Sequence, residues 1–96
     1  MIQFQASQNY IHRKITGQDV LICVGEDIAN FNGYVQLNAT AAALWDAMSA
    51  PKTAAELEKL LIDGYGISGE DARSDVAEFL TLLQENKMIR VIGNVL

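Results

Sequence analysis

Cysteine, histidine and proline each occur only once in the 96 residues of this sequence, and these scarcities limit what the protein can be. The single cysteine, Cys23, excludes an internal disulfide and a zinc site built on cysteine pairs. Its neighbours Val20 to Val24 indicate a buried strand position, since a free cysteine is usually a small core hydrophobe and not a reactive thiol. One proline and 50% hydrophobic residues favour a globular chain over a disordered one.

Basic residues are scarce as well, with seven Lys and Arg against twelve Asp and Glu and a net charge of −5 at pH 7. Contacts to nucleic-acid phosphates need a clustered excess of Lys and Arg, so the charge argues against nucleic acid and favours a basic partner. No apolar run approaches the roughly 18 residues that span a bilayer, and the N-terminus lacks the order of a signal peptide. We expect a cytoplasmic protein with no membrane partner.

The sequence lacks the combination of residues that a catalytic site needs. Nucleophilic catalysis needs a Ser, Cys or Lys with a base to activate it, and the only histidine, His12, has no motif around it. We expect His12 to occupy a half-exposed strand position and to have no catalytic or metal-binding role. The glycines stand singly at predicted turns, and none forms a phosphate-binding loop. We therefore expect no enzyme activity, no cofactor and no metal.

The first third of the chain has the pattern of three strands, at residues 9–15, 19–25 and 34–37. Thr16-Gly17-Gln18 predicts a turn between the first two, and Asn32-Gly33 predicts a tight turn before the third. Consecutive strands joined by short turns usually pair antiparallel. We expect a three-stranded antiparallel sheet with the third strand at its edge.

The second of these strands is apolar on both faces. Val20, Ile22 and Val24 alternate with Leu21 and Cys23. Successive side chains of a strand point to opposite faces of the sheet, so this pattern predicts a strand that is covered on both sides.

The rest of the chain has the pattern of three helices, at residues 39–49, 54–64 and 69–86, followed by a short extended tail at 88–92. The first helix is predicted to start at the N-cap Asn38, the second at the capping box Thr53-Ala54-Ala55-Glu56, and the third at the N-cap Ser68. Pro51 ends the first helix, and Tyr65-Gly66 ends the second. The apolar stripes predicted to face the core are Ala41, Leu44, Trp45 and Met48, then Leu57, Leu60 and Leu61, then Ala72, Val76, Phe79, Leu80 and Leu83.

These elements predict a single α+β domain over residues 1–96, with a three-stranded antiparallel sheet followed by three helices in a winged-helix-like arrangement. A chain of this size buries only about 60–70% of its unfolded surface, so its stability margin is small and a homodimer stays open.

The third predicted helix tests whether such a domain binds DNA. Between Gly69 and Asn86, one basic residue, Arg73, stands against five acidic ones: Glu70, Asp71, Asp75, Glu78 and Glu85. A recognition helix in the major groove needs Arg, Lys, Asn or Gln toward the bases, so this helix would repel DNA. The acidic residues form either a solvated face or a surface that meets basic residues of a partner.

Five pieces of the sequence in order, LNATAAALW, PKTAAEL, YGIS, DVAEFLTLL and ENKMI, resemble the PqqD-like family, which is named for coenzyme PQQ synthesis protein D and is also described as the RiPP recognition element. The resemblance covers residues 34–89. It implies a non-enzymatic adaptor that binds the leader segment of a ribosomally made precursor peptide. The adaptor presents that peptide to a maturation enzyme, such as a radical SAM enzyme, a cyclodehydratase or a leader peptidase.

The resemblance also implies where the peptide binds. The leader adds as an antiparallel strand to the third strand and lies between it and the third helix. The edge would be Tyr34, Val35, Gln36 and Leu37. On the third helix, Asp75, Phe79 and Leu82 form one flank, and the alternative flank is Arg73, Ala77 and Gln84.

Two other functions stay open, a winged-helix DNA-binding regulator and a structural module that dimerises through its edge strand. The precursor peptide and its pathway are also open, because residues 26–34 lack the Leu-Leu-Xaa-Pro-Glu type of run that we associate with the PQQ-specific members. If the Val35 amide points outward, Val35→Pro is expected to abolish leader binding.

Overall fold

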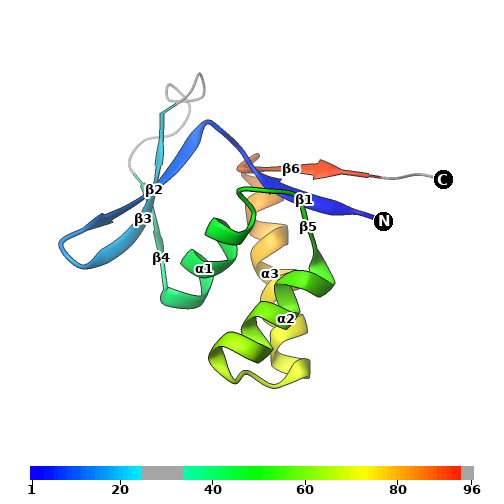
Figure 1. The fold of residues 1–96 in the computed structure, drawn as a ribbon. Coiled ribbons are helices and arrows are strands. Elements are labelled where there is room, and N and C mark those ends of the chain that lie inside the picture. The colour runs from blue at the N-terminus through cyan, green and yellow to red at the C-terminus, as the bar shows by residue number, and fades with distance from the viewer. Residues whose placement is uncertain (25–33, 94–96) are drawn as a thin grey trace.

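The computed structural model describes residues 1–24 and 34–93 (Figure 1). The predicted turn at Asn32-Gly33 lies outside these residues. In chain order the described elements are β1 (Gln3–Ala6), β2 (Tyr10–Ile15), β3 (Gln18–Cys23), β4 (Tyr34–Leu37), α1 (Ala39–Ala47), β5 (Lys52–Thr53), α2 (Ala54–Tyr65), α3 (Gly69–Glu85) and β6 (Ile89–Ile92). No helix in the described part of the chain has the length and apolar character needed to cross a membrane.

The strands form two separate antiparallel sheets, one beside α1 and the other at one end of α2 and α3 (Figure 1). The first sheet has the order β2-β3-β4, and the second has the order β5-β1-β6. The predicted α+β class and the predicted three-stranded sheet are both confirmed. The expected tail at 88–92 is confirmed as β6, which pairs with β1 from Gln3↔Ile92 to Ala6↔Ile89.

The second sheet is a feature that the sequence pattern did not predict. β1 reads Gln-Phe-Gln-Ala, which has only one strongly β-favouring residue, and β5 is two residues long. These segments become strands because distant parts of the chain pair with them: Phe4 lies opposite both Lys52 and Val91. Local propensity carries no signal for such long-range pairing.

The β2–β3 hairpin turns on Thr16 and Gly17, as predicted. Both residues have positive φ, 51° and 80°, as a two-residue type I′ turn requires. β3 is buried on both faces at its centre, where Val20 and Leu21 are 2% and 0% exposed. The prediction is wrong at the end of the run, because Val24 follows the strand and is 51% exposed.

All three predicted helix starts are confirmed. The Asn38 side chain accepts a hydrogen bond from the Ala41 N–H at 2.8 Å. Thr53 and Glu56 form a capping box, in which the Thr53 N–H donates to Glu56 Oε1 at 2.8 Å and lowers the pKa of Glu56. Ser68 caps α3, and Gly66 ends α2 in the left-handed conformation with φ 66°.

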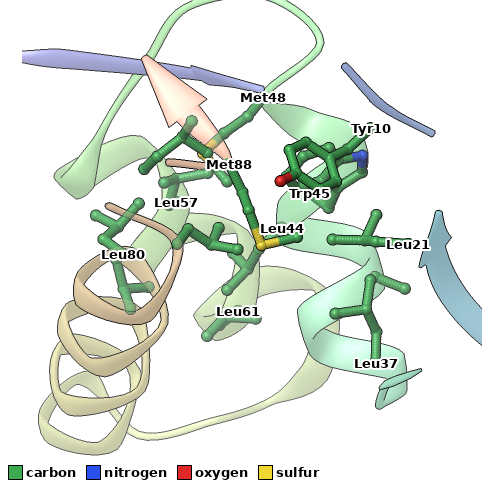
Figure 2. Close-up of a cluster of buried hydrophobic side chains, with 14 of the residues drawn as sticks. Tyr10, Leu21, Leu37, Leu44, Trp45, Met48, Leu57, Leu61, Leu80 and Met88 are labelled. Atoms are coloured by element: carbon green, nitrogen blue, oxygen red, sulfur yellow. The ribbon is translucent and has the colours of Figure 1, made fainter. Parts of the chain in front are cut away.

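The core lies around α1 (Figure 2). Leu21 and Leu37 of the β2-β3-β4 sheet lie on one side of this helix, while the α2 and α3 side chains lie on the other. The predicted stripes are buried at Leu44, Trp45, Met48, Leu57, Leu61, Ala72, Val76, Leu80 and Leu83, and Cys23 is buried as expected. Three members of the predicted stripes, Ala41, Leu60 and Phe79, are only partly buried and pack at the margin of the core.

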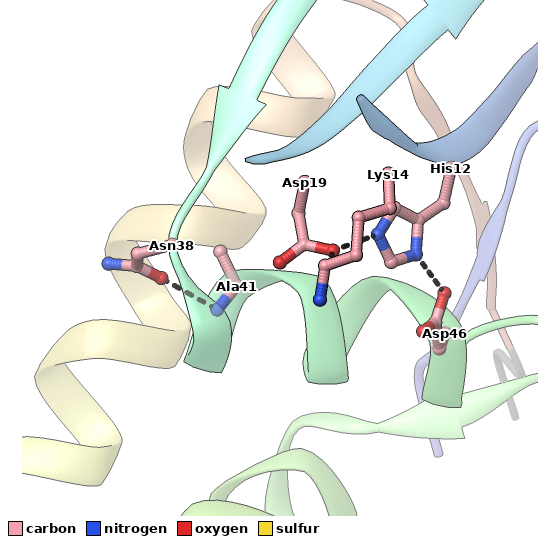
Figure 3. Close-up of polar contacts among 6 residues, drawn as sticks. All are labelled: His12, Lys14, Asp19, Asn38, Ala41 and Asp46. Carbon is pink, nitrogen blue, oxygen red and sulfur yellow. Dashed lines mark hydrogen bonds and ion pairs between the residues drawn. The ribbon is translucent and has the colours of Figure 1, made fainter. Parts of the chain in front are cut away.

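His12 fastens the β2–β3 hairpin to α1 (Figure 3). Its Nε2 contacts Asp19 Oδ1 and its Nδ1 contacts Asp46 Oδ1, each at 2.8 Å. Two hydrogen bonds raise the pKa of His12 above its ordinary value of 6.5. The bond with Asp19 has the larger effect, and the bond with Asp46 has the smaller one. Both ring nitrogens donate in the imidazolium form, so the protonated side chain of His12 on β2 binds both β3 and α1. The His12 side chain is 21% exposed, in agreement with the predicted partly exposed strand position.

The raised pKa makes this contact depend on pH. A raised folded-state pKa means that the stabilisation is fully present below the unfolded value of 6.5 and is lost as the pH rises through the folded value. His12→Gln should lower the free energy of unfolding by about 1 kcal/mol at about pH 5.5 and by less at about pH 9. The expected loss is small because the Asp46 side chain is 60% exposed and solvent screens its contact with His12. Urea unfolding at both pH values measures the difference.

Lys14→Gln is the matched control, because Lys14 also approaches Asp19, at 3.9 Å, but has no imidazole. An equal effect of His12→Gln at both pH values would contradict the assigned role of the imidazolium.

Candidate functional site

β4 is the edge strand of its sheet. It pairs with β3 from Asp19↔Leu37 to Ile22↔Tyr34, and no other strand among residues 1–24 and 34–93 pairs with it. The prediction that residues 34–37 form a strand at the edge of the sheet is therefore confirmed. An edge strand presents unpaired N–H and C=O groups that another chain can bind.

The register shows which residues of β4 present those groups. The Val24 N–H donates to the Asn9 carbonyl at 2.7 Å, and hydrogen-bonded pairs alternate along an antiparallel ladder. In the β2–β3 register this alternation directs Val20 and Ile22 toward β2, which leaves Asp19 and Leu21 to bond β4. Their partners in β4 are Leu37 and Val35. The N–H and C=O groups of Tyr34 and Gln36 therefore face the open edge, and the Val35 amide faces inward.

The side chains of β4 alternate between the core and the solvent. Leu37 is 7% exposed and belongs to the core, and Val35 is partly buried against it. Tyr34 is 63% exposed, and Gln36 is exposed as well. A strand added to this edge would alternate in the same way, with every second side chain on the core face of the sheet.

A cavity of about 300 Å³ lies where β4 passes into α1. It is lined by three groups of residues, which are Asn38, Thr40, Ala41 and Leu44 at the start of α1, Leu61 of α2, and Asp75, Glu78, Phe79 and Leu82 of α3. Figure 3 shows the Asn38 side chain on the side of β4 that faces away from β2 and β3. The cavity and the open edge of β4 thus meet at Asn38.

The cavity combines apolar and acidic side chains. Leu44 and Leu61 are buried, Phe79 is partly buried, and Leu82 is 47% exposed. Asp75 and Glu78 are exposed, and neither forms a salt bridge with a side chain in the described part of the chain. The arrangement suits an apolar group with a positive charge beside it.

The structure places one of the two predicted flanks of α3 next to the junction between β4 and α1. Asp75, Phe79 and Leu82 all line the cavity, whereas Arg73, Ala77 and Gln84 do not. Among the strand residues, Tyr34, Val35, Gln36 and Leu37 form the neighbouring edge and do not line the cavity. The binding role of these seven residues stays a prediction.

Sequence reasoning missed part of the cavity. The sequence indicates Asn38 only as an N-cap and Glu78 only as part of the acidic surface of the third helix, and it does not single out Thr40. Thr40 Oγ1 donates to Asn38 Oδ1 at 3.0 Å, so both polar side chains are held in place at the mouth of the cavity. The signal that could have found them is the N-cap, because in this chain the cap directly follows the edge strand. No cluster of three or more His, Cys, Asp or Glu side chains within the described ranges could hold a metal ion.

Comparison with known proteins identifies relatives of this arrangement. The family model described as coenzyme PQQ synthesis protein D (PqqD) matches residues 20–89. A solved lasso peptide synthetase B1, complexed with the leader peptide, is 25% identical with a TM-score of 0.70, and the match covers 91% of this chain and 96% of that chain. The fold is also similar to that of TbiB1 in complex with the TbiA(beta) leader peptide, with 18% identity, a TM-score of 0.70 and coverage of 95% and 98%. No curated protein matches the sequence significantly.

The register of β4 predicts unequal losses of stability for two neighbouring proline substitutions. Val35→Pro removes an amide that faces β3 and should lower the free energy of unfolding by about 1–3 kcal/mol. Gln36→Pro removes an amide that faces the open edge and should lower it by less than about 1 kcal/mol, because edge strands accept proline there. Urea unfolding of both variants measures the difference, and the reverse order would show that the inferred hydrogen-bond pattern is wrong.

Proposed function

The chain belongs to the coenzyme PQQ synthesis protein D (PqqD) family, and on this premise we propose that it is a leader-peptide-binding adaptor in the biosynthesis of a ribosomally made, modified peptide. It binds the leader segment of the precursor and presents the core segment to a maturation enzyme. The adaptor performs no chemistry itself. The observation that carries this proposal is the open edge of β4 next to a partly apolar cavity.

Strand addition explains why this edge and this cavity belong together. The outward backbone groups of Tyr34 and Gln36 bond an added strand without regard to its sequence, since every residue except proline offers the same groups. The cavity supplies the selectivity, because one side chain of the added strand can enter it from the core face. The lasso peptide synthetase B1 that is 25% identical to this chain was solved with its leader peptide, which supports the same role here.

The two other candidate functions are less well supported. A DNA-binding regulator would present α3 to the phosphates, but α3 carries five acidic residues and one basic residue from Gly69 to Glu85. A dimerisation module would use the β4 edge for a second copy of the chain, and it would leave the acidic lining of the cavity without a function.

The partners follow from this role. We place the protein in the cytoplasm, where the precursor is synthesised, as one peptide-binding domain over residues 1–96. Its enzyme partner is a radical SAM enzyme, a cyclodehydratase or a leader peptidase. A maturation-enzyme gene near its own gene would distinguish among these enzymes.

The test of this function is a titration of the isotopically labelled protein with synthetic leader segments of the short peptide genes that neighbour its own gene. We expect amide resonances of Tyr34, Gln36, Phe79 and Leu82 to shift with one of these peptides, because these residues form the edge and the flank of the cavity. Absence of shifts with every neighbouring leader would contradict the proposal. A molar mass that doubles with concentration by light scattering, with β4 protected in the dimer, would favour the dimerisation module.

The edge itself is tested by Gln36→Pro. This substitution removes one outward amide and places a ring where the added strand approaches, so leader affinity should fall about tenfold or more. Fluorescence anisotropy with the labelled leader measures the affinity. The matched control is Gln36→Ala, which removes the same side chain but keeps the outward amide and should keep the affinity, with the folded state of each variant verified by circular dichroism. Unchanged affinity of a folded Gln36→Pro variant would exclude the β4 edge as the docking site.

A further inference from the structure

We propose that the cavity beside β4 selects peptides in which an apolar anchor residue is followed or preceded, two positions away, by a Lys or Arg. This inference rests on the proposed function and names the chemistry of the peptide that the site accepts. It is carried by the spacing of acidic and apolar side chains on α3, by the missing cation partners of the acids and by the alternation of an added strand.

The α3 face of the cavity contains two acid–apolar pairs with the same spacing. Asp75 precedes Phe79 by four residues, and Glu78 precedes Leu82 by four residues, and all four side chains line the cavity. Residues four apart on a helix lie on one face, separated by about 6 Å along the axis. In each pair the acid lies about one helical turn nearer the start of α3 than its apolar partner.

An extended peptide has a matching period. Residues i and i+2 of a strand point to the same face and lie about 6.6 Å apart. When one side chain of a strand added to β4 enters the cavity beside Phe79 or Leu82, its neighbour two positions away lies at a distance of about one helical turn. That is the distance along α3 from Phe79 to Asp75 and from Leu82 to Glu78. The residue between them points to the opposite face, where Tyr34 and Gln36 are exposed.

The charge of this second residue follows from the two carboxylates. Asp75 and Glu78 lie beyond the first turn of α3, which already contains Glu70 and Asp71, so the helix dipole gives them little stabilisation. No Lys or Arg of the described residues pairs with either, although Asp63 on α2 does have such a partner in Lys59 at 3.0 Å. A Lys or Arg side chain can lay its apolar stem along Leu82 and place its charge between the two carboxylates.

A selection from a library of random 12-residue peptides displayed on phage tests the inference. We expect the wild-type protein to enrich peptides with an aliphatic or aromatic residue and a Lys or Arg two positions away. The Asp75→Asn/Glu78→Gln variant should enrich the same apolar anchor without the basic residue. The matched control is Glu58→Gln/Glu70→Gln, which changes the net charge equally at two positions outside the cavity and should keep the preference.

The affinities of one enriched peptide and its variant measure how much the basic residue contributes to binding. Replacing its basic residue by Gln should weaken binding to the wild type by about threefold to tenfold, as expected for the loss of one or two solvent-exposed ion pairs. The same replacement should change binding to the Asp75→Asn/Glu78→Gln variant by less than about twofold. The wild-type affinity should fall with rising salt, and the dependence should be weaker for the variant.

The outcomes separate this inference from the proposed function. Peptides that share the apolar anchor and shift the β4 amides, but have no basic preference or keep it in the Asp75→Asn/Glu78→Gln variant, would overturn the charge selection and leave the adaptor function intact. Enrichment of no peptide, or of peptides that leave the β4 amides unshifted, would overturn both.

Discussion

The structure depends on the burial of one short helix. α1 has nine residues, which is too short to be stable alone, so its stability comes from the packing of Leu44, Trp45 and Met48. Leu21 and Leu37 of the sheet pack on one side of it, and residues of α2 and α3 pack on the other (Figure 2). This helix therefore holds the β2-β3-β4 sheet and the helical pair together, and the position of the candidate site follows from it.

The same packing keeps an edge strand open. β4 enters α1 directly through Asn38, which caps the helix, and Leu37 is already part of the core. The strand is thus fixed on its inner face and at its end, while its outer backbone groups lack a strand partner among residues 1–24 and 34–93. His12 adds a polar contact between the hairpin and α1 through Asp19 and Asp46. A rigid, open edge loses little conformational entropy when a peptide adds to it, which is the physical advantage of this arrangement for an adaptor.

The candidate site is composite, with a generic part and a selective part. Backbone groups of Tyr34 and Gln36 face the open edge, and side chains of α3 line the adjoining cavity. The acidic residues of α3 disfavour DNA binding. Two of them, Asp75 and Glu78, also line that cavity. One distribution of charge thus disfavours nucleic acid and is complementary to the basic peptide that we propose.

The sequence alone determined the local elements of this protein. Side-chain caps at Asn38, Thr53 and Ser68, the turn at Gly17 and the helical apolar stripes act between residues close in the chain, so their signals can be read directly. Tertiary structure alone decided three things. It paired β1 with β5 and β6, it directed the amides of Tyr34 and Gln36 outward, and it brought Asn38 and Thr40 next to α3. Each of these depends on contacts between distant residues, which local propensity and periodicity do not encode.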